Sequence, residues 1–324
     1  MIATIINKAI VQGIPLLFGS TGEIITEKSG NLNLGIPGIM YIGGSAGVIS
    51  AYIYESSVAE PTPFLCILIP LLCSLIGSAL VSLIYSFLTI TLRANQNVTG
   101  LALTTFGVGF GDFFGGSLTK IVGNGGNLSV KTTADYFKTT LPFADDLGAF
   151  GEIIFSYGFL VYLAIIIALV ASWVLNRTRV GLHLRAVGEN PATADAAGIN
   201  VTKYKYIATC VGGAIAGLGG LYFIMDYTGG SWTNGGFGDR GWLAIALVIF
   251  ALWKPNIGIL GSIVFGGLYI AYSYISGLSR SSLALFNMLP YAVTIIVLIL
   301  TSVRSKKENQ PPESLGLPYF REER

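Results

Sequence analysis

The sequence predicts an all-α polytopic membrane protein of about nine transmembrane helices, some of them short or broken. Three observations predict this class. Hydrophobic residues make up 52% of the 324 positions and charged residues only 11%, whereas charged residues are about 25% of a soluble domain. The mean hydropathy is +0.68. Glycine accounts for 42 residues, which in an apolar chain favours helices that approach one another closely.

Several windows are long enough to cross about 30 Å of hydrocarbon as helices and contain no Asp, Glu, Lys or Arg. These windows are Leu32–Tyr54, Phe64–Leu92, Ile153–Leu175, Tyr206–Met225 and Ile257–Leu278. Weaker or shorter candidates are Ile2–Gly22, Val98–Gly116, Gly241–Trp253 and Asn287–Val303. The chain therefore divides into a transmembrane domain, residues 1–303, and a C-terminal tail, residues 304–324.

The basic residues predict the orientation of these spans. If the loop 177–205 is cytoplasmic, nine crossings place Lys28, Arg93, Lys254 and the tail from Arg304 on the same side. Most of the Lys and Arg residues are then inside, as the positive-inside tendency requires. We expect a cytoplasmic C-terminus and an N-terminus on the outer face.

A polar segment, RAVGENPATADAAGI (185–199), separates two of the charge-free windows. Pro191 suits the first position of a helix, Asn190 can cap its free N–H groups, and Gly198 supplies a left-handed stop. The segment therefore predicts a two-turn helix over 191–197. Such a helix is too short to stand alone and too polar to enter lipid, so we expect a rigid surface contact for another protein. An ordinary solvated loop is the alternative.

The sequence contains no motif that would let this chain power transport by itself. It contains no G-x-x-x-x-G-K-[ST] loop for nucleotide phosphates. Charged residues are missing from most predicted spans, Asp112 near the outer surface being the main exception, so the relays of many proton-driven carriers are not expected. A partner that supplies energy through the surface helix is the economical interpretation. The formal net charge of +2 gives no argument for nucleic acid.

Three stretches and the end of the chain carry a family resemblance. Thr21–Met40, Arg93–Leu103 and Arg185–Ile199, together with the ending LGLPYFREER, resemble the permease subunits of bacterial ABC importers for ribose-type sugars and nucleosides. The ending is most similar to the nucleoside branch. The resemblance implies a multi-pass subunit of the bacterial cell membrane that moves nucleosides inward by alternating access, with ribose or another simple sugar as the alternative cargo.

The resemblance also implies partners. It implies a second, related but non-identical permease, two cytoplasmic ATP-binding subunits that carry the ATP and Mg, and an extracellular substrate-binding protein. No cofactor or metal is expected in this chain. Segment 185–199 would be the cytoplasmic coupling helix that sits in a groove of the ATPase. The residues expected to serve this contact are Arg185, Gly188, Glu189, Asn190, Pro191, Asp195, Ala197 and Gly198.

Two interrupted segments predict the substrate pathway. Leu32–Tyr54 contains Gly35, Pro37 and Gly38, and a helix broken in this way exposes backbone groups to a cavity. Gly241–Trp253 spans only about 20 Å, which fits a half-helix or a gate. A sugar or nucleoside needs amides, hydroxyls and aromatic faces. The candidates are Asn33, Tyr41, Asn97, Thr99, Thr104, Thr105, Phe106 and Trp242. Alternatively, Asn and Thr tie helices together and the aromatic residues form an interfacial belt.

Other matches favour structural roles. Gly43–Gly47 fits a G-x-S-x-G hydrolase pattern, but that motif needs a histidine partner, and the only histidine, His183, lies in the 177–205 loop. The same glycines, with Gly107–Gly111 and Gly213–Gly217, match the small-xxx-small pattern of close helix contact. The three cysteines lie in apolar runs and are expected to fill space. A secondary transporter working alone and an intramembrane enzyme are the rival classes.

Overall fold

The structure is a computed structural model that describes residues 2–121, 128–140, 148–271, 280–304 and 309–321. The described chain is helical, as predicted, and its extended pairing is limited to a single bridge between Ser129 and Ser231. The helices are α1 (Ile2–Glu27), α2 (Ile36–Ser57), α3 (Pro63–Ser86), α4 (Gln96–Ile121), α5 (Lys131–Phe137), α6 (Gly148–Ile154), α7 (Phe159–Arg177), α8 (Arg179–Glu189), α9 (Pro191–Ala196), α10 (Val201–Tyr222), α11 (Arg240–Phe250), α12 (Pro255–Ile270) and α13 (Arg280–Arg304). Two π-helical turns, η1 (Phe87–Thr91) and η3 (Phe223–Tyr227), extend α3 and α10.

Each of the nine predicted spans overlaps one of these helices, and the last part of Ile257–Leu278, residues 272–278, lies outside the described residues. Five helical stretches of the described chain are long and apolar enough to cross a membrane, and they contain α1, α2, α3, α7 and α10. Shorter apolar helices occur in α11, α12 and α13. With 11 residues, α11 is about 16 Å long, so it does not cross a bilayer alone. It ends at a turn in which Leu252 and Trp253 have positive φ, and α12 begins at Pro255.

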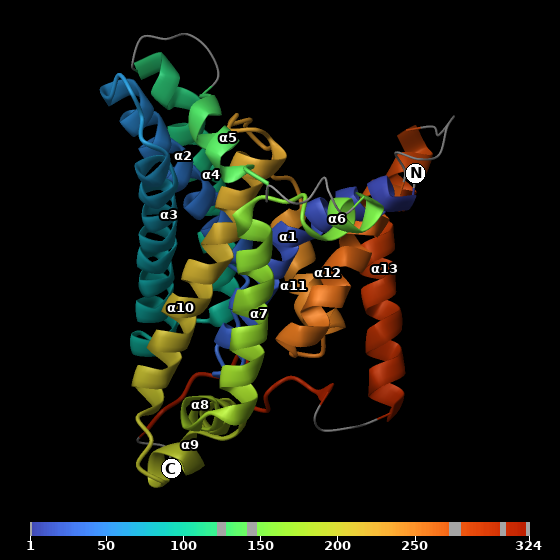
Figure 1. Ribbon diagram of the computed structural model, residues 1–324. Coiled ribbons are helices and arrows are strands. Elements are labelled where there is room, and N and C mark those ends of the chain that lie inside the picture. Colours follow the sequence, from blue (N-terminus) through green and yellow to red (C-terminus); the bar gives the residue numbers. More distant parts are fainter. Residues whose placement is uncertain (1, 122–127, 141–147, 272–279, 305–308, 322–324) are drawn as a thin grey trace.

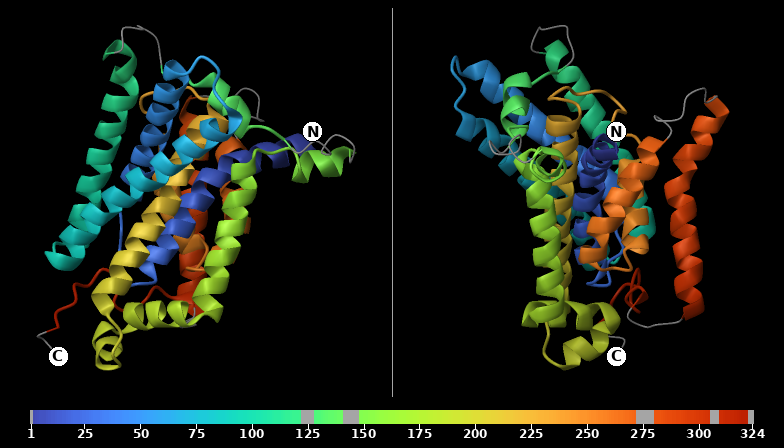
Figure 2. Two further views of the ribbon diagram at one scale, coloured as in Figure 1. Left: turned by 60° about the vertical axis from the view of Figure 1, so that its left-hand side comes forward. Right: turned by 45° about the vertical axis from the view of Figure 1, so that its right-hand side comes forward.

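Helix α1 is the centre of the bundle. It packs against α7, α10, α11 and α12, and most of its span is buried inside the protein. By contrast, α3 and α7 keep about a third or less of their span windows buried, which fits helices whose outer faces contact lipid. Figures 1 and 2 show α13 at one edge of the bundle, where it contacts α11 and α12.

Glycine lets the central helices touch backbone to backbone, as the small-xxx-small pattern predicts. A Cβ on Gly43 of α2 would lie 2.5 Å from the Cα of Gly217 of α10. A Cβ on Gly107 of α4 would lie 2.5 Å from the Cα of Gly38 of α2. Ser45 lies inside α2 and donates to the carbonyl of Ile42 at 3.1 Å, so Gly43–Gly47 forms no hydrolase elbow. The three cysteines are free.

The two ends of the bundle differ. α8 and α9 lie at one end, which we call the α8–α9 end; the N-terminus lies at the opposite end (Figure 1). Gly188 of α8 contacts Lys28, and Arg93 lies over the ring of Phe320 in the C-terminal segment. Lys254 donates to Asn309 at 2.8 Å. Lys28, Arg93 and Lys254 therefore lie at the same end of the bundle as the 177–205 loop, as predicted.

Two predicted boundaries are wrong. α1 continues past Gly22 to Glu27, which brings Glu23 and Glu27 into a helix that was expected to end before them. The expected break inside Leu32–Tyr54 is also absent, because residues 28–35 form a loop and α2 runs without interruption from Ile36. Pro37 lies in the first turn of α2, where it removes no helical hydrogen bond.

Candidate functional site

The predicted surface helix is present as α9, Pro191–Ala196, slightly shorter than the expected 191–197. The side-chain oxygen of Asn190 accepts from the amide of Thr193 at 2.9 Å, which caps the helix. Gly198 has φ +82° and donates to the carbonyl of Asp195 at 2.9 Å. The amide of Ile199 donates to Ala194 at 3.0 Å, so these last bonds satisfy the carbonyls that the helix leaves open.

Part of segment 185–199 belongs to a separate helix, α8, which was not predicted. Arg185, Gly188 and Glu189 lie in α8, which begins after the N-cap Thr178. Figure 2 shows α8 turned across the end of α7, so the two form a bend. Apolar Leu184 and Val187 of α8 are buried while Glu189 is exposed. Segment 185–199 therefore contains the end of α8 and the whole of α9, which are joined at Asn190.

Gly188 joins α8 to two remote segments. A Cβ at this position would collide with the carbonyl oxygen of Lys28 and lie 3.2 Å from the amide nitrogen of Gly30. The carbonyl of Gly188 accepts from the amide of Ser314 at 3.0 Å and also from its hydroxyl. Only glycine fits this joint, which ties α8 to the end of α1 and to the C-terminal segment.

The C-terminal segment, residues 309–321, also holds α9. Asp195 accepts from the hydroxyl of Tyr319 at 3.0 Å and lies 3.2 Å from Nε of Arg321. Asp195 is therefore engaged within this chain, and Glu189 is the acidic residue of the segment that remains exposed. Ala192, Ala197 and Gly198 are also exposed, so the outer face of α9 carries short side chains.

Lys28 lies beneath this junction. Burial lowers the pKa of its ammonium group, and nearby Arg185 acts in the same direction, while the opposite charge of Glu189 raises that pKa. His183 is also occupied, because its Nδ1 lies 2.8 Å from the hydroxyl of Tyr204. No cluster of three metal-ligating side chains occurs in the described residues.

Two predicted pathway residues meet where α2 begins. Asn33 is fully buried, its amide donates to Glu23 at 3.0 Å, and its side-chain oxygen accepts from Gly35 at 2.9 Å. Thr104 of α4 donates to the carbonyl of Leu34 at 2.7 Å. These bonds close the loop 28–35, and they leave the side-chain nitrogen of Asn33 without a partner.

The other polar candidates do not converge on this place. Thr99 and Thr105 donate to carbonyls of their own helix, those of Asn95 and Leu101, at 2.8 and 3.1 Å. Asn97 is exposed on the outside of α4.

The aromatic candidates are likewise separated. Tyr41 is buried and makes edge contacts with Trp232 and Phe237, with ring centroids 6.1 and 5.5 Å apart. This aromatic group encloses a cavity of only about 20 Å³. Phe106 is 57% exposed on α4, and Trp242 is half-buried on α11. The structure therefore brings together Asn33 with Thr104, and Tyr41 with the 231–237 loop.

Sequence reasoning missed a buried acidic pair. Glu23 and Glu27 lie one turn apart on α1, and both are buried. Glu23 accepts from the amide of Asn33, and Glu27 accepts from the indole nitrogen of Trp253. The pair therefore links α1 to the loop before α2 and to the α11–α12 turn. The signal was present in the sequence, since the two acids have helical i, i+4 spacing directly after an apolar run.

A buried arginine was also missed. Arg240, at the start of α11, is 5% exposed and donates to the carbonyls of Gly236 and Phe237 at 3.3 and 2.9 Å. Its guanidinium lies 4.5 Å from the ring centroid of Phe223. The expected exception, Asp112, accepts from the amide of Gly235 at 3.2 Å, so it fastens α4 to the same loop.

Comparison with known proteins finds relatives whose alignments cover most or all of this chain. It is 32% identical over 300 residues to the nucleoside ABC transporter permease protein NupC of Lactococcus lactis, covering 91% of both chains. It is 31% identical over 337 residues to the guanosine ABC transporter permease protein NupQ of Bacillus subtilis, covering 100% of this chain and 98% of NupQ. It is 31% identical to the putative glucose ABC transporter permease protein TsgC13 of Haloferax volcanii, covering 82% of this chain and 75% of TsgC13.

A more distant relative occurs in the same Lactococcus lactis strain as NupC. The nucleoside ABC transporter permease protein NupB is 24% identical over 249 residues. Residues 5–298 match the family described as the permease component of the branched-chain amino acid transport system. The match covers all the long apolar helices together with α8 and α9, and the chain belongs to this family of membrane permease components.

Proposed function

We propose that this chain is one membrane subunit of an ATP-driven importer that carries nucleosides into the cell by alternating access. The observation that supports a nucleoside as the transported substrate is the similarity, over nearly the full length of the chain, to a guanosine permease, NupQ, and to a nucleoside permease, NupC. The similarity to a putative glucose permease at nearly the same identity makes a simple sugar the alternative cargo.

The energy enters from two ATP-binding subunits through α8 and α9. The exposed face of this pair, Glu189, Asn190, Ala197 and Gly198, is the contact surface, while Arg185, Gly188, Pro191 and Asp195 shape and hold it. Support comes from the capped ends of α9 and from the joint at Gly188, because a short helix held at both ends moves as a unit. The α8–α9 end and the C-terminus are then cytoplasmic.

The proposal also includes the rest of the assembly. A second, non-identical permease completes the pathway, and the occurrence of two related nucleoside permeases, NupB and NupC, in one organism supports a pair of this kind. An extracellular binding protein delivers the nucleoside at the opposite face of a bacterial cell membrane. Residues 1–303 form the permease domain and residues 304–324 the cytoplasmic tail.

The pathway residues are proposed in two groups. Asn33 lies in the loop before α2, to which Thr104 of α4 donates a hydrogen bond, and Tyr41 lies beside Trp232 toward the other end. Asn97, Thr99, Thr105 and Phe106 lie on α4, and Trp242 lies on α11. The exposed side of α4 is where a second permease would complete the pathway.

Uptake by the reconstituted complex tests the function. Vesicles that hold the complex and ATP should accumulate labelled guanosine, and vesicles with labelled glucose should not. Vesicles that hold this chain alone should show no flux. Flux through the chain alone would establish a secondary transporter instead, and glucose uptake without guanosine uptake would move the proposal to sugars.

Co-purification tests the coupling surface. Glu189→Arg reverses the exposed charge of α8 and should release the ATPase subunits. The matched control is Asp135→Arg, an equal charge change at an exposed position of α5 near the opposite end of the bundle. Equal retention of the ATPase by both variants would contradict the assignment of this surface.

A further inference from the structure

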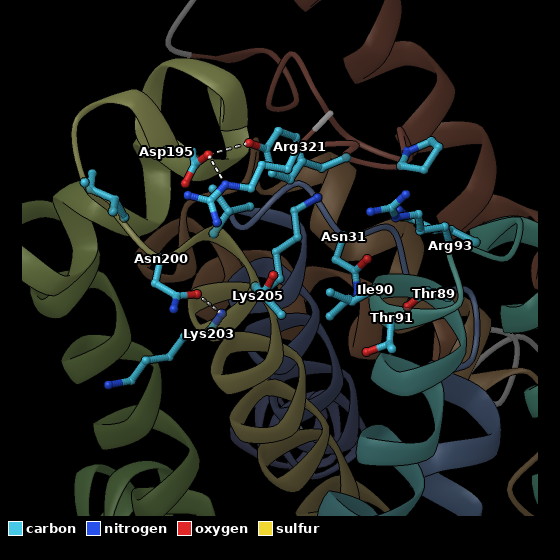
Figure 3. Close-up of a pocket in the computed structure, with 17 residues that line it drawn as sticks. Asn31, Thr89, Ile90, Thr91, Arg93, Asp195, Asn200, Lys203, Lys205 and Arg321 are labelled. Atoms are coloured by element: carbon cyan, nitrogen blue, oxygen red, sulfur yellow. Dashed lines mark hydrogen bonds and ion pairs between the residues drawn. The ribbon is translucent and has the colours of Figure 1, made fainter. Parts of the chain in front are cut away.

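A polar cavity lies at the α8–α9 end of the described chain, and the proposed transport cycle assigns no ligand to it. Its volume is about 740 Å³. The α9–α10 turn, the start of α10, the end of η1, the loop before α4 and the C-terminal segment form its walls (Figure 3). It therefore lies between segments that are remote in the sequence, and the C-terminal segment closes one side.

The lining of this cavity is strongly cationic. Its charged residues are Arg93, Lys203, Lys205, Arg321 and Asp195. Asp195, the acid among them, is already bonded to Arg321 and Tyr319. Basic side chains therefore outnumber acidic ones among the charged residues of the lining.

Lys205 is the most informative of these residues. It is only 3% exposed, on the first turns of α10, and no acid among the described residues pairs with it. Figure 3 shows Lys205 and Arg93 reaching toward the same space from different walls, whereas Lys203 points away from it. A buried ammonium group is costly without a counter-charge, so an anion in the cavity would stabilise this lysine in its charged form.

The start of α10 adds to this preference. Asn200 caps the helix by accepting from the amide of Lys203 at 2.9 Å, and the cavity is also lined by Val201 and Thr202, the first residues of this 22-residue helix. The first turn of a helix carries partial positive charge and favours anions. The helix end and the buried lysine therefore favour the same sign of ligand.

We propose that this cavity binds a phosphate group, with Lys205 as its counter-charge. A phosphate fits because it carries the negative charge that the wall lacks and several acceptor oxygens for donors from different directions. The group can come from an anionic phospholipid headgroup or from a free phosphate compound. An apolar groove of about 830 Å³ between α7, α8 and α10 shares Asn200 and Lys203 with the cavity. Acyl chains would fit such a groove.

The test uses the whole transporter complex and two probes. In the first arm, inorganic phosphate is titrated into the complex in a neutral detergent, and the thermal unfolding midpoint is followed. In the second arm, the complex is placed in nanodiscs of phosphatidylcholine with or without phosphatidylglycerol. A ligand that binds the folded protein raises the midpoint as its concentration passes Kd. The arm that stabilises the complex identifies the source of the phosphate.

Substitutions locate the effect. Lys205→Met should weaken the response to the stabilising probe at least tenfold in concentration, whereas Lys205→Arg should keep it. Lys131→Met removes the same side chain from an exposed position at the start of α5, and it should respond as the unsubstituted protein does. If Lys205→Met does not fold, Lys205→Gln serves in its place. The proposal is overturned if neither probe stabilises the complex, or if loss of the Lys205 charge leaves the response unchanged. Neither result depends on which cargo is transported.

Discussion

Gly220→Ala should destabilise the fold, because Gly220 of α10 lies directly against α2. A Cβ at this position would lie 2.8 Å from the carbonyl carbon of Met40 and 2.9 Å from the amide nitrogen of Gly44, with the Met40 oxygen closer still. All three neighbours are backbone atoms. No side chain can rotate away, so α2 and α10 must separate to accept a methyl group.

The magnitude follows from two opposing effects. Overpacking a well-packed core costs typically 1–3 kcal/mol, and the rigid neighbours here favour the upper end, about 3 kcal/mol. Replacing glycine by alanine inside a helix returns about 1 kcal/mol. The expected net loss is therefore about 2 kcal/mol, which lowers the unfolding midpoint by about 4–8 °C at roughly 2–4 °C per kcal/mol.

The assay is thermal unfolding of the purified protein, followed by the fraction that remains monodisperse after heating. Gly109→Ala is the matched control, since Gly109 lies in α4 and a Cβ there would meet no atom within 4 Å. Its midpoint should stay unchanged or rise. Equal midpoints for Gly220→Ala and Gly109→Ala would refute the argument that α2 and α10 touch through backbone atoms.

Three further predictions concern the α8–α9 end. Gly198→Pro should abolish ATP-dependent uptake, whereas Gly198→Asn should keep most of it. The reason is that φ of Gly198 is +82°; proline is locked near −65°, but asparagine tolerates the left-handed region. Similar uptake by both variants would contradict this prediction. Trp253→Phe removes the indole donor from the buried Glu27 carboxyl group and should lower the free energy of unfolding by about 1–3 kcal/mol, which an unchanged midpoint would disprove. Asp195→Asn removes an ion pair with the side chain of Arg321, which is 72% exposed. The loss in the free energy of unfolding should therefore stay below about 1 kcal/mol, while trypsin should cut the C-terminal segment faster. An unchanged rate of digestion would count against the contact.

Local signals explain what could be predicted from the sequence. The helix α9 was predicted because Asn190, Pro191 and Gly198 act on the backbone within one or two residues. The nine apolar segments were predicted because hydrophobic length depends little on tertiary structure. The close contacts of Gly43 and Gly107 were predicted because small residues in apolar helices favour contact.

What was missed depends on contacts between remote segments. α1 continues to Glu27 because Asn33 and Trp253 donate hydrogen bonds to its acidic pair, and Trp253 is 226 residues away from Glu27 in the sequence. Thr99 and Thr105 have the composition of pathway residues, yet they bond to their own helix. Composition names the groups that a site needs, but the direction of a side chain is decided by the packing of its helix.

The joint at Gly188 limits how a force on the α8–α9 surface can spread. One peptide group there is held by Ser314 on one side and pressed against Lys28 and Gly30 on the other. A displacement imposed on α9 from outside therefore reaches rigid backbone before it reaches any long loop. It would arrive at the end of α1 beside Lys28, and α1 is the most deeply buried of the long apolar helices, so a push at the periphery would act on the middle of the subunit before it acts on the lipid-facing helices.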